Sequence, residues 1–232
     1  PYLGAAAVVA GAVGHDTTIL KSTDAGNSWR SMYYAPQTQS PLLDIAFVDD
    51  QRGFAVGAYG TFLETRDAGM HWTPRKIANQ DLHFNAIAVL DSSTLLIAGE
   101  AGTLLHSTDA GQTWQARPSP YVGSWFGIVA LDAKTALLFG LRGKLFRTDD
   151  AGGQWTELST GTTSALMGGR VLEDGRIVVV GNEGVILIST DRARSFTLHQ
   201  QAGNPALATL LAYKQQWWLF GERGVTRVNA PQ

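Results

Sequence analysis

One short sequence pattern returns five times in this chain and limits its possible folds more than any other feature. The pattern is Ser or Thr, any residue, Asp, Ala or Arg, Gly or Ala, two variable residues and an aromatic residue. The acids of successive copies lie about 40 residues apart, so the chain is built from internal repeats. The copies are Ser22–Trp29, Thr65–Trp72, Ser107–Trp114, Thr148–Trp155 and Ser189–Phe196.

A glycine marks a second fixed point in each repeat, ten positions before the acid. These glycines are Gly14, Gly57, Gly99, Gly140 and Gly181, and a sixth follows at Gly221. Short apolar segments end at them, as in Gly53–Gly57, Leu95–Gly99 and Ile177–Gly181. Segments of this length and composition, bounded by turn residues, predict β-strands.

Each repeat has room for four strands. One further apolar segment precedes the glycine and another follows it, and the stretch around the terminal aromatic residue supplies the fourth. The preceding segments are Leu42–Val48, Phe84–Leu90, Phe126–Leu131 and Leu207–Tyr213, and the following ones are Thr61–Glu64, Thr103–His106, Lys144–Arg147 and Val185–Ile188. Four strands of roughly five residues with short turns make about 40 residues, the size of one propeller blade. Helical repeats would instead show apolar spacing near 3.6 residues over longer stretches.

We therefore expect an all-β fold, a β-propeller of four-stranded antiparallel blades whose strands run a, b, c, d in chain order. Six blades fit the landmarks best. The alternative is seven blades, with part of the ring outside this chain. The expected single domain covers residues 1–232, with repeat units of about 1–35, 36–79, 80–120, 121–160, 161–203 and 204–232.

The start of the chain fits the same register. Residues Pro1–Gly14 supply strand b of the first unit, with too few residues before it for a full strand a. The Ala-rich run Leu3–Val13 resembles the apolar part of a secretion signal, yet it ends at a glycine as the other b strands do. We therefore interpret it as a strand and expect that any signal peptide lay upstream and was removed.

Composition and spacing argue against several functional classes. The net charge of −2 offers no basic field for a nucleic acid, and the absence of cysteine removes disulfides and thiolate metal sites. The longest apolar run is far shorter than the roughly 20 residues of a membrane-spanning helix. The five histidines show no metal-ligand spacing. We expect no metal, no cofactor and no nucleic-acid partner, with peripheral membrane attachment at most.

The acidic turn pattern itself has a structural explanation. An Asp carboxylate in a tight turn accepts backbone N–H groups of the residues that follow it, and glycine permits backbone conformations that other residues avoid. The aromatic residue gives each blade a large side chain to pack. The predicted structural residues are Asp24, Gly26, Trp29, Asp67, Gly69, Trp72, Asp109, Gly111, Trp114, Asp150, Gly152, Trp155, Asp191 and Phe196. The last pattern lacks both the glycine and the Trp, so we expect its hairpin to be the loosest.

These segments carry a family resemblance. Ser22–Trp29 and Ser107–Trp114 resemble the Asp-box, or BNR, repeat of sialidases, sortilin-type receptors and other propellers. A longer pattern is narrower: Leu43–Asp49, then Gly53–Gly57 with Gly60, then the box. This combination resembles the photosystem II stability/assembly factor family, whose relatives also occur in bacteria that do not photosynthesise. The resemblance covers essentially the whole chain.

The resemblance implies a non-catalytic propeller, exported to the periplasm or a lumen, that assists the assembly or stability of a membrane-associated protein complex. Its partner would be a protein. Photosynthetic members are described as seven-bladed and as binding through clustered arginines, whereas the equivalent turns here are mixed in charge. A scaffold for another envelope complex therefore fits the sequence as well as a photosystem role, and a purely structural repeat module is a further possibility.

The enzymatic alternative is a sialidase-like propeller, or another propeller that binds a carbohydrate or small ligand. Sialidases resemble this chain in their boxes, but they need an arginine cluster, a Tyr nucleophile with a supporting acid and usually an Arg-Ile-Pro segment near the start. No Arg-Ile-Pro occurs here, and Arg176-Ile177-Val178 lies inside a predicted strand. We expect no enzymatic activity.

Propeller topology indicates where a binding surface would lie. The b-to-c turns and the d-to-a connections emerge at one face, opposite the boxes. Loop-borne aromatic residues and arginines often anchor protein interfaces. The candidate residues for a partner-binding face are Tyr34, Tyr59, Tyr121, Trp125, Arg142 and Arg223. For Trp125, at the start of a strand, blade packing is the alternative interpretation.

Overall fold

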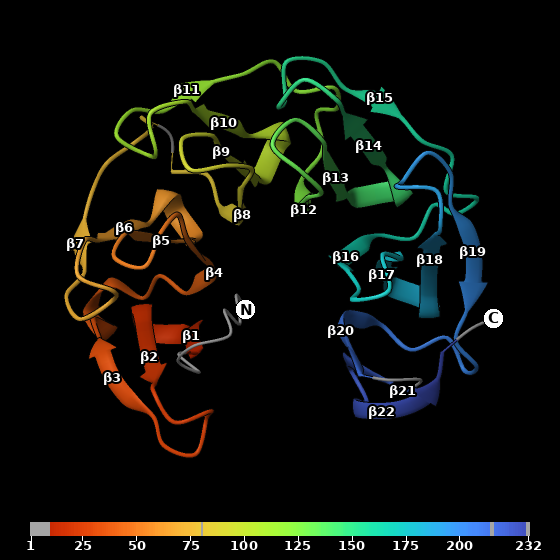
Figure 1. The fold of residues 1–232 in the computed structure, drawn as a ribbon, viewed down its shortest axis with the longest axis horizontal. Helices are drawn as coiled ribbons and strands as arrows, with labels where there is room; N and C mark the ends of the chain where they lie inside the picture. Colours follow the sequence, from red (N-terminus) through yellow and green to blue (C-terminus); the bar gives the residue numbers. More distant parts are fainter. Residues whose placement is uncertain (1–9, 80, 214–215, 231–232) are drawn as a thin grey trace. The chain divides into compact units, whose positions relative to one another are not determined.

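A computed structural model describes residues 10–79, 81–213 and 216–230 of the chain. The chain divides into two compact units, Pro1–Ser119 and Pro120–Gln232, and each is described by itself. Both are built from antiparallel sheets whose strands follow one another in chain order (Figure 1).

The first unit contains three sheets. The first sheet is β1 (Ala10–Gly14), β2 (Thr18–Ser22) and β3 (Arg30–Tyr33). The second is β4 (Leu42–Phe47), β5 (Gly53–Gly57), β6 (Phe62–Thr65) and β7 (Thr73–Pro74), and the third is β8 (Phe84–Val89), β9 (Leu95–Gly99), β10 (Leu104–Ser107) and β11 (Gln115–Ala116).

The second unit repeats the arrangement. Its first sheet is β12 (Trp125–Ala130), β13 (Ala136–Gly140), β14 (Leu145–Thr148) and β15 (Thr156–Glu157). Its second is β16 (Leu166–Val171), β17 (Ile177–Gly181), β18 (Val185–Ser189) and β19 (Thr197–Gln200), and its third is β20 (Leu207–Tyr213), β21 (Gln216–Gly221) and β22 (Gly224–Asn229).

These six sheets are six β-propeller blades, which confirms the predicted fold class. Four blades carry strands a to d, and the described parts of the first and last carry b to d and a to c. In the first blade, β1 is the predicted strand b, and the rest of the run Leu3–Val13 lies outside the described residues. The prediction of one domain over residues 1–232 stays a prediction.

Two details differ from the expected strands. Strand d begins after the box aromatic residue rather than around it, and in β7, β11 and β15 it pairs over only two residues. Strand β16 had no predicted counterpart, because Gly168 and Gly169 interrupt its apolar pattern. Its register with β17 is nevertheless regular apart from a bulge between Leu166 and Gly168.

Close packing between neighbouring blades explains these two glycines. A Cβ on Gly168 would lie 2.2 Å from the carbonyl oxygen of Ala208 in β20. A Cβ on Gly169 would lie 3.0 Å from the ring of Phe139, and one on Gly127 would lie 2.2 Å from the same ring. The Phe139 side chain therefore fills the space that glycine leaves on two a strands, β12 and β16.

The central b strands form the core of the blades. All five residues of β5, β9, β13 and β17 are buried. Side chains of adjacent blades share apolar clusters, such as Leu137 and Phe139 with Val179 and Leu187. Between the fifth and sixth blades, Trp217 is fully buried in one cluster with Val178 and Val180.

Candidate binding face

The acidic boxes close the c-to-d turns with a repeated set of hydrogen bonds. In the third box, Ser107 Oγ donates to Asp109 Oδ1 at 2.8 Å and accepts from the N–H of Gly111 at 2.9 Å. The Asp109 carboxylate also accepts from the Thr113 N–H at 2.8 Å and from Thr113 Oγ1 at 2.6 Å. The boxes of Asp24, Asp67, Asp150 and Asp191 have the same core of bonds.

These bonds explain the acidity of the box carboxyls. The Thr113 hydroxyl and N–H lower the pKa of Asp109 to about 2, and the N–H and ring of His71 do the same for Asp67. Hydrogen bonds from Ser195 hold the pKa of Asp191 far below its usual value. Each acid is therefore committed to its own turn. No group of three or more His, Cys, Asp or Glu suited to a metal ion occurs in residues 10–79, 81–213 and 216–230.

The last box keeps this geometry without its glycine. Ala193 takes the glycine position at a φ of 60°, and its N–H donates to Ser189 Oγ at 2.9 Å. Phe196 packs against the apolar cluster that its own blade shares with the preceding blade. Strand β19, which follows, pairs with β18 over four residues. The prediction that this hairpin is the loosest of the five is therefore wrong: its turn has the same hydrogen bonds as the other boxes, and its strands pair over four residues.

The candidate face lies at the other end of the c strands, where five b-to-c connections form short 3₁₀ turns. After five of the landmark glycines, the next residue donates its N–H to the residue before strand a, as Glu100 does to His83 O at 2.9 Å. A Cβ on Gly99 would lie 2.1 Å from that oxygen, and Gly57, Gly140, Gly181 and Gly221 are equally close to theirs. These five glycines allow the b-to-c turn to lie in direct contact with the d-to-a connection.

Side chains at the tips of these turns project from left-handed backbone. The middle residues are Asp16, Tyr59, Ala101, Arg142 and Glu183, with φ between 50° and 58°. This region is uncommon for residues other than glycine, so its recurrence indicates a tightly determined turn. These middle residues differ from one another in size and in charge.

In the first unit, the candidate tyrosines are exposed. Tyr34 is 62% exposed and Tyr59 is 59% exposed. The Tyr59 ring meets the edge of His83 at 4.9 Å between centroids, and Gly60 N–H donates to Leu82 O at 2.9 Å. Tyr59 is thereby held beside the connection that leads into the next blade.

In the second unit, Trp125 does not belong to the surface. Its side chain is fully buried, with ring contacts to Tyr121 and Phe146 at 5.6 Å each. Blade packing therefore explains Trp125, and we exclude it from the candidate face. Tyr121 is partly buried and lies over Gly123, whose Cβ would be 2.2 Å from its ring.

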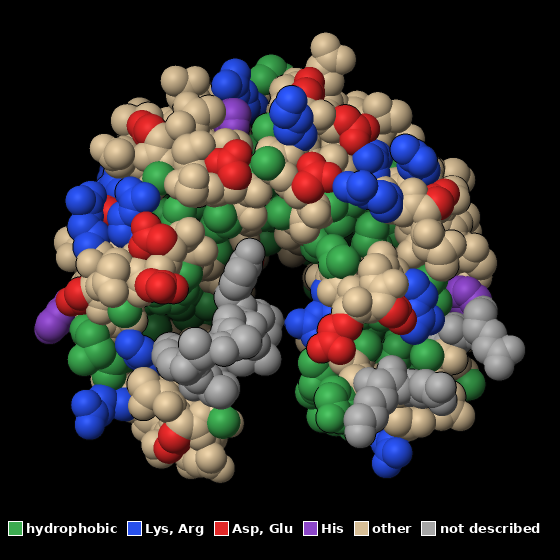
Figure 2. All heavy atoms as spheres, viewed as in Figure 1, with side chains coloured by type: hydrophobic (Ala, Val, Ile, Leu, Met, Phe, Trp, Pro, Cys, Tyr) green, Lys and Arg blue, Asp and Glu red, His purple; other side chains and the backbone are tan. Residues whose placement is uncertain are grey.

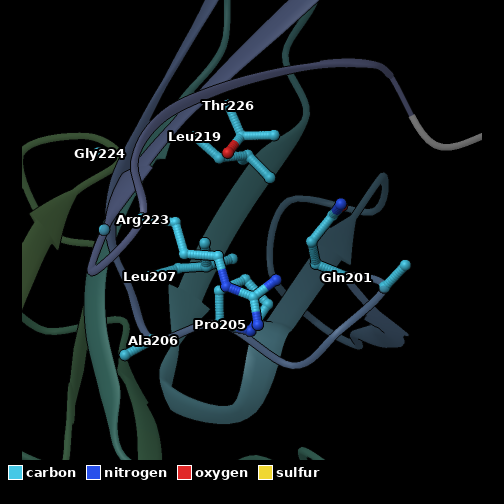
Figure 3. Close-up of a pocket in the computed structure, with 10 residues that line it drawn as sticks. Gln201, Pro205, Ala206, Leu207, Leu219, Arg223, Gly224 and Thr226 are labelled. Atoms are coloured by element: carbon cyan, nitrogen blue, oxygen red, sulfur yellow. The ribbon is translucent and has the colours of Figure 1, made fainter.

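The two candidate arginines have different surroundings. Arg223 reaches over Pro205 to the Gln201–Pro205 loop, where its Nη2 donates to Gly203 O at 2.8 Å (Figure 3). This contact gives Arg223 a structural partner. Arg142 is exposed and makes no hydrogen bond or ion pair within the described residues.

Arg142 borders a groove of about 630 Å³ within the second unit. The groove lies between the turn Leu141–Gly143, the connection from β15 to β16, and Glu183 of the next turn. Sequence inspection missed that connection, although its run of hydroxyl residues, Ser159-Thr160-Gly161-Thr162-Thr163-Ser164, was a visible signal. Figure 2 shows positive and negative side chains interspersed on the viewed surfaces.

Comparison with known proteins assigns the chain to a family. A family model described as "Photosynthesis system II assembly factor YCF48" matches residues 35–219. The chain belongs to this family. The predicted resemblance is confirmed, and the match runs from the second blade into the sixth, where it ends within β21.

Individual relatives match over shorter segments. The photosystem II assembly protein Ycf48 of Thermosynechococcus vestitus is 34% identical over 64 residues, 27% of this chain and 18% of the relative. The chloroplastic photosystem II stability/assembly factor HCF136 of Arabidopsis thaliana is 38% identical over 69 residues, 27% of this chain and 17% of the relative. The matched segments thus span under a fifth of these relatives.

Solved structures agree on the fold. A structure titled "YCF48 bound to D1 peptide" is 26% identical, with a TM-score of 0.68 over 82% of this chain and 65% of that one. YCF48 from Cyanidioschyzon merolae is 22% identical, with a TM-score of 0.66 over 83% of this chain and 68% of that one. The WD40 propeller of Doa1, at 12% identity, reaches 0.75 over 97% of this chain and 75% of that one and shows the fold alone.

Proposed function

We propose that this protein is a non-catalytic scaffold that binds a segment of a membrane-associated protein complex and assists its assembly or stability. The observation that carries the proposal is membership of the YCF48 family over residues 35–219. Relatives are named as assembly and stability factors, and one related structure holds a D1 peptide. The partner class is therefore a protein.

The binding face of this proposal is the end of the blades that carries the b-to-c turns. Exposed Tyr34 and Tyr59 in the first unit and Arg142 in the second are the side chains offered to a partner. Aromatic residues and arginines anchor interfaces because they bury large areas and form directional contacts. At the box end, each Asp carboxylate already accepts hydrogen bonds from its own turn.

The compartment of this proposal is extracytoplasmic, a periplasm or a lumen. Relatives from Trichormus variabilis and Nostoc are named as lipoproteins, and those from Arabidopsis thaliana and Guillardia theta as chloroplastic. No helix in the described part of this chain is long and apolar enough to span a bilayer.

A non-enzymatic role is supported by the family names and by the commitment of each box acid to its turn. Propellers host many functions, so fold alone does not exclude catalysis. Each box carboxylate instead accepts hydrogen bonds from its own turn.

The proposal is tested by affinity capture from native membranes of the source cells. Tagged protein is cross-linked in the membranes, and captured proteins are identified by mass spectrometry. We expect one integral membrane complex to be captured reproducibly by the wild type and to be lost with Tyr34→Ala, Tyr59→Asn and Arg142→Gln combined. A matched control carries Met70→Ala and Arg194→Gln in the box turns. Failure of the wild type to capture any membrane complex would overturn the proposal.

A further inference from the structure

The groove beside Arg142 in the second unit is a preformed polar surface. Thr160 Oγ1 donates to Gly143 O at 3.0 Å, which fixes the β15–β16 connection to the neighbouring turn. A Cβ on Gly143 would lie 2.1 Å from Thr162 O, so the two segments are in direct backbone contact. Such a surface loses little conformational entropy when it binds, because its loop is already ordered.

The lining of the groove is suited to a polar chain rather than to a small apolar ligand. Hydroxyl residues of the segment 159–164 form one wall, and Leu158 is the only side chain of the lining that is apolar. Small-molecule pockets are usually concave and lined by apolar and aromatic side chains. The hydroxyls of Ser159 and Thr163 are exposed and have no partner in the described residues, so they can donate to or accept from a ligand.

Among the charged groups that line the groove, Lys144 and Glu157 form an ion pair, Glu183 is held by a neutral hydroxyl, and Arg142 has no hydrogen-bond or ion-pair partner in the described residues. Lys144 Nζ lies 2.6 Å from Glu157 Oε1, and Glu183 Oε2 accepts from Ser164 Oγ at 2.7 Å. The guanidinium of Arg142 borders the same groove at the tip of a turn with a φ of 57°. It is therefore the cation there without a counter-ion, and its planar fork matches a carboxylate.

We infer that this groove binds an extended, polar peptide segment that places one carboxylate on Arg142. The inference rests on the proposed function and names the chemistry of the partner's segment. The carboxylate belongs to an Asp or Glu side chain or to a chain terminus, and the hydroxyls of Ser159 and Thr163 bind polar groups that flank it. The carboxylate of Glu183 in the same lining repels further negative charge, which favours one carboxylate over a polyanion.

The test is titration of the ¹⁵N-labelled protein, followed by NMR, with short Gly/Ser peptides whose central residue is Asp or Asn. Each is made with a free and with an amidated C-terminus. We expect the Asp peptide to shift the amide signals of residues 142–144 and 159–164 and to bind about fivefold more tightly than the Asn peptide. If the amidated Asn peptide, the one form without a carboxylate, binds as well as the three carboxylate-bearing peptides, the inference is wrong.

Three variants separate the role of Arg142 from a general charge effect. Arg142→Gln should abolish the preference for a carboxylate, and Arg142→Lys should retain part of it. Arg194→Gln removes an exposed charge in the box turn that follows β18 and should leave the preference unchanged. Equal losses in Arg142→Gln and Arg194→Gln would contradict the inference.

An oligosaccharide is the competing ligand class. A maltohexaose titration that shifts residues 159–164, while the peptides do not, would overturn the peptide assignment. The capture experiment separates this inference from the proposed function. If Arg142→Gln alone leaves capture of the membrane complex intact and the peptides shift nothing, the groove is not the docking site, and the scaffold proposal still stands.

Discussion

The ring of Phe54 in β5 occupies the space that a side chain on Gly111 would need. A Cβ on this glycine of the third box would lie 2.3 Å from Phe54 Cζ. Phe54 also stacks on Phe62 at 5.3 Å and meets the edge of Trp114 at 6.4 Å. The box of one blade is thus fitted around an aromatic side chain of the preceding blade.

Gly111→Ala should therefore cost more stability than the same change in another box. Both Gly111 and Gly26 have positive φ, of 81° and 85°, but a Cβ on Gly26 would meet only the Trp29 ring, at 3.8 Å. We expect Gly111→Ala to lower the free energy of unfolding by about 3 kcal/mol, from overpacking plus backbone strain, and Gly26→Ala to lower it by about 1 kcal/mol. Urea denaturation measures both, and equal losses would contradict this packing argument.

Acid should weaken the box turns over a defined pH window. The folded-state pKa of Asp109, about 2, lies below the ordinary value of 3.8, so its carboxylate contributes stability above pH 3.8. That contribution is lost as the pH falls from 3.8 towards 2. We expect Asp109→Asn to make the denaturation midpoint less dependent on pH between 4 and 2.

The control for this prediction is Asp50→Asn. Asp50 is exposed and accepts no hydrogen bond in the described structure. Its replacement should leave the pH profile of the wild type unchanged. A profile for Asp109→Asn that coincides with that of the wild type would show that the box carboxylate does not stabilise the fold.

Loss of the Glu64 charge should cost more stability than loss of the Glu157 charge. Its side chain is 8% exposed and pairs with Arg66 Nε at 2.8 Å and Arg75 Nη1 at 2.6 Å. Removing its charge leaves a partly buried arginine without its counter-ion, so Glu64→Gln should lower the free energy of unfolding by about 2 kcal/mol. Glu157→Gln breaks a pair whose acid is 52% exposed and should cost under about 0.5 kcal/mol. Similar midpoints for both variants in thermal denaturation would refute the distinction.

Alanine substitutions of two aromatic residues predicted for the binding face, Trp125 and Tyr34, should differ strongly in their effect on stability. Trp125 is fully buried, so Trp125→Ala should lower the free energy of unfolding by about 4 kcal/mol. Tyr34 is 62% exposed, and Tyr34→Ala should change it by less than about 0.5 kcal/mol. Chemical denaturation of the two variants decides the assignment, and a Tyr34→Ala variant as unstable as Trp125→Ala would remove Tyr34 from the face.

The repeat pattern was enough to predict the blades. The landmark glycines and boxes mark the ends of b and c strands, and the predicted strand Leu207–Tyr213 has the same bounds in the structure. The steric reason why these positions need glycine could not be predicted from the sequence. Position 99 requires glycine because a Cβ there would lie 2.1 Å from the carbonyl oxygen of His83. His83 lies sixteen positions earlier, and a single sequence does not reveal this contact.

The candidate site was less predictable because exposure depends on neighbouring blades. Residue type suggested Trp125 as an interface anchor, and packing by Tyr121 and Phe146 buries it. Arg142 and Arg223 occupy related turns, yet one is unpaired and the other bonds to Gly203 O. The groove beside Arg142 depends on the contact between Gly143 and Thr160. The run of hydroxyl residues around Thr160 is visible in the sequence, but its contact with the turn at Gly143 is not.

The most direct test of the scaffold proposal is site-specific photo-cross-linking in native membranes. A photo-reactive amino acid replaces Tyr59 or Arg142 in the b-to-c turns, or Met70 or Arg194 in the box turns. We predict cross-links to one membrane complex from Tyr59 and Arg142 and none from Met70 and Arg194. Cross-links to that complex only from the box positions would contradict the proposed face, and no membrane-protein product from any position would contradict the scaffold function itself.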